Sequence, residues 1–165
     1  MNLDTLGNIA DIIAIPIALV GVYLVIKQLY LARIESENEH KRRKEITLNA
    51  YNAIREELRE TSKKVRETLQ LENMFSQLDD NHVQQIYLNR DLKNDVTKML
   101  SIMERFALGV HHDVFDINLI NDLSGTVFIQ TFKQFKPYIE KSRENSKTFY
   151  TDYEKLANEL EILRR

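Results

Sequence analysis

An uncharged apolar run near the start constrains this 165-residue chain more than any other feature. Residues 12–26 carry no charged side chain, and no other stretch is as apolar. Because a spanning helix needs about 17–25 residues, we extend the predicted transmembrane helix to residues 9–32. The longer segment ends with Lys27, Gln28 and Tyr30 near one boundary, where such side chains reach the headgroup region.

Two other interpretations of the run stay open. A cleavable signal peptide needs a basic start, whereas residues 1–11 contain two aspartates and no Lys or Arg. A core helix of a soluble protein is the second alternative, because the uncharged part is short for a span.

The basic residues predict the orientation of the span. Lys27, Arg33 and the cluster 41–44 follow it, and no basic residue precedes it. Since Lys and Arg are retained on the cytoplasmic side, residues 1–8 should form an outer tail and residues 33–165 should be cytoplasmic.

Small residues predict self-association of the helix. Ala14, Ala18 and Gly21 fall along one helical stripe, which lets two backbones approach closely in lipid. Asp11 lies beside the stripe, where an acid favours a protein interior or a watery lumen over lipid. Alternatively, small residues are common in any span and Asp11 sits at the outer surface.

The remainder predicts an all-α fold. Only four glycines and two prolines occur in the chain, too few for a turn-rich β protein. Residues 33–47 are strongly charged and predict a helical connector. Residues 48–165 are enough for one helical bundle. From their apolar spacing, its helices run over 48–69, from near Asp91 as cap to Val110, from about 117 to Phe135, and from Pro137 onward.

The last of these helices has an apolar inner face. The residues expected on it are Tyr138, Ile139, Tyr150, Tyr153, Leu156, Leu160 and Leu163.

No phosphate-binding loop, zinc-ligand spacing or nucleophile elbow occurs. His111, His112, Asp113 and Asp116 are too loosely spaced to define a metal site, so we expect neither a metal nor a cofactor. The net charge of −2 predicts no large basic surface for nucleic acid.

Two arginines of the bundle belong to short motifs. Arg105 is followed six residues later by His111. This spacing resembles the signature of HEPN ribonucleases, an Arg with a His four to six residues later, which implies a phosphate ligand and an acid/base group for RNA cleavage. The alternative is that Arg105 anchors the bundle. Arg143 is followed instead by Thr148, which cannot serve as a general base. This second motif is degenerate, and Arg143 is expected to form an ion pair or to order the last two helices.

Further residues carry a family resemblance. The stretch Glu104–Val110 with Phe115-Asp116, and the set Pro137-Tyr138-Ile139, Arg143, Tyr150 and Tyr153–Leu156, resemble a broader family of small single-span bacterial proteins of unknown function. The order of parts, a single N-terminal span, a charged helical connector and a small divergent HEPN-like bundle, resembles the membrane accessory proteins of type VI-B CRISPR systems.

The CRISPR resemblance implies a homo-oligomeric pore in the bacterial inner membrane that acts in antiviral defence when an RNA-guided RNA nuclease is triggered. Ala14, Ala18 and Gly21 would then be packing positions, and Asp11 would face the lumen. The implied partners are the lipid bilayer, further copies of the chain and, functionally, the nuclease, while direct binding of RNA is left open. The alternatives are a non-enzymatic membrane scaffold and a HEPN-type ribonuclease acting through Arg105 and His111.

Overall fold

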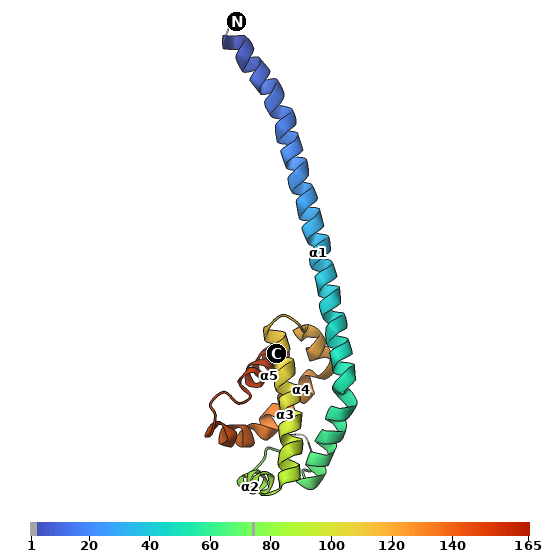
Figure 1. Ribbon diagram of the computed structural model, residues 1–165, viewed down its shortest axis with the longest axis vertical. Coiled ribbons are helices and arrows are strands. Elements are labelled where there is room, and N and C mark those ends of the chain that lie inside the picture. The colour runs from blue at the N-terminus through green and yellow to red at the C-terminus, as the bar shows by residue number, and fades with distance from the viewer. Residues whose placement is uncertain (1–2, 74) are drawn as a thin grey trace. The chain divides into compact units, whose positions relative to one another are not determined.

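The computed structural model describes the backbone of residues 3–73 and 75–165 and, within these ranges, the side chains from residue 20 onward. Five helices and no strand occur in these ranges, which confirms the all-α prediction (Figure 1). The chain divides into two compact units, Met1–Arg42 and Arg43–Arg165. Helix α1 (Leu3–Thr68) begins in the first unit and ends in the second.

In the first unit, the described side chains from residue 20 onward are exposed. Gly21 has no atom near the position that a Cβ would take. The predicted span residues Asp11, Ala14 and Ala18 lie outside the residues whose side chains are described. Within the described part of the chain, none of the helices is sufficiently long and apolar for a membrane crossing.

The second unit contains every buried side chain described. Helices α2 (Asp80–Leu88), α3 (Arg90–His111), α4 (Ile117–Arg143) and α5 (Thr151–Leu163) surround its core together with the end of α1. Buried residues of α3 recur every three or four positions, so one face of this helix enters the core. These residues are Leu92, Val96, Met99, Leu100, Ile102, Met103, Phe106 and Ala107.

Polar contacts set the direction of neighbouring helices. Glu57 and Lys64 of α1 pair with Lys98 and Asp95 of α3, each at 2.6 Å, so α1 and α3 are antiparallel.

The start of α4 lies beside Thr47, whose hydroxyl accepts a hydrogen bond from the Asp116 backbone N–H at 2.8 Å. Helix α4 therefore runs parallel to α1.

A buried amide fixes the other end of α4. The Gln134 side chain donates to the carbonyls of Asn73 and Ser76 at 3.1 and 3.0 Å. The backbone carbonyl of Gln134 in turn accepts from the Leu78 N–H at 3.0 Å. Gln134 thus satisfies the polar backbone of the loop between α1 and α2 inside the protein.

The structure corrects the prediction for residues 79–91. Asp79 caps α2, a helix that was not predicted, and forms a reciprocal capping box with His82. The cap of α3 is Asn89 rather than Asp91, because the Asn89 side chain accepts from the N–H groups of Asp91 and Leu92.

The prediction that Pro137 opens the last helix is wrong. Pro137 lies inside α4, and the last helix begins at Thr151. Proline inside a helix costs about 3 kcal/mol, but Phe135, Tyr138 and Ile139 are all buried around it. Each such burial contributes about 1.5–3 kcal/mol, which outweighs the interruption. Leu163, expected on the inner face, is 48% exposed.

Candidate functional site

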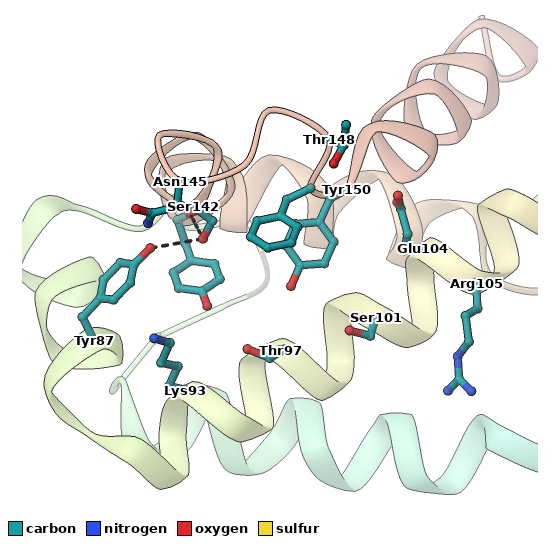
Figure 2. A pocket seen from close by; sticks show the side chains of 12 residues that line it. Tyr87, Lys93, Thr97, Ser101, Glu104, Arg105, Ser142, Asn145, Thr148 and Tyr150 are labelled. Carbon is teal, nitrogen blue, oxygen red and sulfur yellow. Dashed lines mark hydrogen bonds between the residues drawn. The ribbon is translucent and has the colours of Figure 1, made fainter.

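A cavity of about 550 Å³ lies in the second unit, between α3 and the segment that joins α4 to α5 (Figure 2). Both arginine motifs contribute to it, because Arg105 and Thr148 are among its lining residues. The full lining comprises Tyr87, Lys93, Thr97, Ser101, Glu104, Arg105, Tyr138, Ser142, Asn145, Thr148, Phe149 and Tyr150.

One end of the cavity is aromatic. The rings of Tyr87 and Tyr138 are 5.6 Å apart between centroids, and Lys93 Nζ lies 5.0 Å from the Tyr87 centroid. The Tyr87 hydroxyl is 3.2 Å from Ser142 Oγ, which donates to the Tyr138 carbonyl at 2.8 Å. A cation over a tyrosine face adds to the attraction that holds this end together.

Tyr150 lines the cavity from the segment before α5 and has a left-handed backbone conformation, with φ of 57°. This conformation reverses the chain immediately before α5, at a strain cost for a bulky residue. Burial raises the pKa of the Tyr150 phenol to about 12, so the group is neutral at physiological pH. A neutral phenol can donate or accept a hydrogen bond but offers no phenolate nucleophile.

Glu104 caps α5 from a different helix. The N-cap residue Tyr150 makes no side-chain capping hydrogen bond. Instead, the Glu104 carboxylate accepts from the N–H groups of Tyr153 at 2.6 Å and Asp152 at 3.4 Å. Burial raises the pKa of Glu104, although the backbone donors act in the opposite direction. The carboxylate therefore has a structural task at a helix N-terminus.

Arg143 orders the same region. Its guanidinium donates to the carbonyls of Phe149 at 2.8 Å and Tyr150 at 3.1 Å, and it pairs with Glu154 at 2.7 Å. Arg143, at the end of α4, thus contacts both the segment before α5 and α5 itself.

His111 lies beside the first turns of α5. Its Nδ1 is 3.1 Å from Asp152 Oδ1, and its Nε2 is 3.8 Å from Glu159 Oε1 and buried without a hydrogen-bond partner. Burial alone would raise the pKa of Asp152, but hydrogen bonds from Lys155 and His111 hold it below the ordinary value.

The structure does not bring Arg105 and His111 together. A separation of six residues places two side chains roughly 120° apart around an α-helix and about 9 Å apart along it. Arg105 is exposed and points toward α1 (Figure 2). His111 instead contacts Asp152 of α5. Thr148 lies on the far side of the cavity from Arg105, and its hydroxyl is 3.2 Å from Ser146 Oγ.

Aromatic residues that carry the resemblance also have structural roles. Gly109 leaves room for the Phe115 ring, since a Cβ there would lie 2.3 Å from Phe115 Cδ2. Phe115 stacks on Phe106 at 5.0 Å. The buried Tyr153 hydroxyl donates to the Phe128 carbonyl at 2.7 Å. Both signature stretches therefore build the bundle around α5.

Sequence reasoning missed several cavity residues. Tyr87 lies in α2, which was not predicted, and Lys93 lies in the first turn of α3. No sequence pattern therefore placed these two residues in one site. The useful signal was the Asp79-x-x-His82 capping box, which marks the start of α2. Among the described residues, no group of three or more His, Asp or Glu side chains is placed to hold a metal ion.

As a whole, the cavity can bind a small polar or aromatic molecule through hydroxyls, tyrosine faces and Lys93. Its one carboxylate, Glu104, already accepts two backbone hydrogen bonds. The arrangement thus favours binding over acid/base chemistry.

Comparison with known proteins gives one match. A family described as a domain of unknown function, DUF4760, matches residues 12–160. No curated protein and no solved structure matches the chain significantly.

Proposed function

The chain belongs to the DUF4760 family, and from that premise we propose that it is a single-span protein of the bacterial inner membrane. It assembles with further copies through its N-terminal helix. As the resemblance to CRISPR accessory proteins implies, the assembly alters membrane permeability when an RNA-guided RNA nuclease is activated.

The observation that carries the proposal is the exposed apolar surface of α1. Five consecutive apolar residues, 22–26, are each at least half exposed, and five consecutive positions cover all sides of a helix. Burial of each of these side chains would contribute about 1.5–3 kcal/mol, which is lost while the side chain faces water. A lipid environment covers every side of a helix at once, which a groove on a partner protein does not.

The extent of the family match supports an apolar run that is not cleaved from the protein. The match begins at Ile12, the first residue of the uncharged run, and continues through the bundle to Leu160. A segment that the family shares with its bundle favours a permanent anchor over a cleaved signal peptide. The basic residues after residue 26 favour a cytoplasmic bundle.

Membrane attachment is tested by fractionation. We expect the full chain to remain in the membrane after alkaline carbonate washing and to require detergent for release. A variant beginning at residue 33 provides the control and should be released freely. Full-length protein that dissolves without detergent would refute the proposal.

Assembly and permeability are tested together. Ala14→Leu with Ala18→Leu should reduce the mass of the detergent-solubilised particle and the uptake of an impermeant dye, because bulky side chains hold the helices apart. Val20→Leu, on another face of the helix, is the matched control. Dye uptake should be measured both with the nuclease inactive and with it activated.

Each alternative has its own outcome in these experiments. A monomer with unchanged dye uptake, retained on the membrane and bound to a cytoplasmic protein, would indicate the scaffold. Metal-independent cleavage of single-stranded RNA that disappears in His111→Ala would indicate the ribonuclease, although the contacts of His111 with α5 disfavour that role.

A further inference from the structure

A second cavity, of about 230 Å³, lies between α1 and α4 of the second unit. We call it the arginine groove. Its floor is apolar and consists of Leu58, Met99 and Met103, all buried core residues. Val127 of α4 forms part of the opposite wall and is 38% exposed, so the apolar surface reaches solvent.

The α1 wall is cationic. Arg55, Arg59 and Arg66 all line the groove, and no carboxylate is among the described residues that do so. Arg59 lies 3.9 Å from Glu56, at the limit of an ion pair, and Arg66 donates to the Ser62 carbonyl at 3.3 Å. Arg55 forms no ion pair with any residue whose side chain is described. Of the three guanidiniums, Arg59 alone lies within ion-pair distance of a described carboxylate.

From this arrangement we propose that the arginine groove binds an alkyl phosphate, a single hydrocarbon chain with an anionic phosphate head group. The guanidiniums donate to the phosphate oxygens, and the chain lies on the methionine floor. Arg59 is about 6 Å along the helix from Arg55 and about 10 Å from Arg66, so the side chains of two of them can reach one head group.

The chemistry of the wall favours phosphate over carboxylate. Guanidinium forks match carboxylate and phosphate oxygens alike in geometry, but several guanidiniums suit a head group with three terminal oxygens. Methionine adapts its shape to a flexible apolar ligand. The cavity volume equals that of about eight waters at about 30 Å³ each, which suits a short chain segment.

The proposal is tested on the full chain in neutral phosphatidylcholine nanodiscs. The probe is octyl phosphate with a photoreactive group on its chain, and mass spectrometry locates the labelled peptides. We expect labels on the peptides that contain Met99, Met103 and Val127. Inorganic phosphate and octanoate should each compete at least roughly tenfold less well than unlabelled octyl phosphate, because each lacks part of the ligand.

Charge recognition is tested with a probe of opposite sign. Photoreactive octyltrimethylammonium should label the same peptides at least roughly tenfold less. Equal labelling by both probes would show a merely apolar surface and overturn the proposal. Labelling of other peptides only, or equal competition by inorganic phosphate, would overturn it too.

Two variants separate the site from general surface charge. Substituting Arg55, Arg59 and Arg66 together by Gln should reduce labelling at least roughly tenfold, while the same change at the exposed Arg90, Lys136 and Lys147 should not. Val127→Glu places an anion in the groove at a partly exposed position and should also prevent labelling. If Val127→Glu labels as the unmodified chain does, the proposal fails even where the triple variant misfolds. Because the readout is local labelling, its result does not depend on whether the membrane is permeabilised.

Discussion

At the scale of single residues, charged side chains of the bundle replace missing backbone partners. Arg143 satisfies two carbonyls of the segment before α5, and Glu104 satisfies two N–H groups at the start of α5. Motif comparison marked Arg143 but could not give its partners, because residues 149 and 150 offer backbone atoms that leave no trace in side-chain identity.

Replacing Arg143 by Ala should destabilise the full chain by about 1–3 kcal/mol, since two carbonyls and Glu154 lose their donor. Urea unfolding followed by circular dichroism measures this. Lys147→Ala, a nearby exposed cation, should change stability by less than about 0.5 kcal/mol. Equal effects of the two substitutions would contradict the structural role of Arg143.

Glu104 should give the protein a characteristic dependence on pH. Its pKa is raised by folding, so the folded state binds its proton more tightly than the unfolded state does. Stability from this group therefore falls as pH rises from the ordinary value of 4.5 through the folded pKa, and is constant above it.

The Glu104→Gln variant should lack that decline while keeping an oxygen to accept from Tyr153. Glu104→Ala loses the cap and should be less stable than Glu104→Gln at pH 7 by about 1 kcal/mol. Unfolding curves between pH 4 and 8 measure both effects. A decline of the same size in Glu104→Gln would assign the pH dependence to another group.

At the scale of helices, sequence periodicity predicted α3 well and the end of α4 poorly. Apolar spacing identified the buried face of α3 from Leu92 to Ala107. In α4 the same spacing continues through Pro137, and only the packing of Tyr138 and Ile139 against the core shows that the helix continues. The cavity combines α3 with residues of α2 and of the α4–α5 segment, so it depends on tertiary placement that local patterns do not contain.

The junction of α1 with α4 depends on one hydroxyl. Thr47 is fully buried, donates to the Arg43 carbonyl and accepts from the Asp116 N–H. Thr47→Val keeps the shape but leaves that N–H without an acceptor, which should cost about 1–3 kcal/mol.

Amide hydrogen exchange tests this locally. In Thr47→Val, exchange at Asp116 should accelerate, whereas Thr47→Ser retains the hydroxyl and should preserve protection there. Unchanged exchange at Asp116 in the valine variant would show that the bond carries little of the stability at this junction.

At the scale of the whole molecule, the two units differ in what covers their apolar surface. Every buried side chain described lies in Arg43–Arg165, whereas the described part of Met1–Arg42 has a continuous apolar stretch without a core of its own. The second unit therefore has its own core, and none of the side chains described in the first unit is buried.

A fragment of residues 43–165 should therefore fold alone, with a single cooperative urea transition. A fragment of residues 69–165 should not, because it lacks Leu58 and Val65 of the core. Circular dichroism and one-dimensional NMR distinguish the two. Loss of cooperativity in the longer fragment would show that the first unit contributes to the core.

The borrowed cap of α5 also has a consequence for biogenesis. Helix α5 follows α1 to α4 in the chain, and its first turn is completed by Glu104 of α3. Translation adds about 5–20 residues per second. The mostly apolar stretch at residues 20–31 is therefore synthesised several seconds before α5. During those seconds the bundle lacks α5, and the Glu104 carboxylate has no N–H group of that helix to accept from.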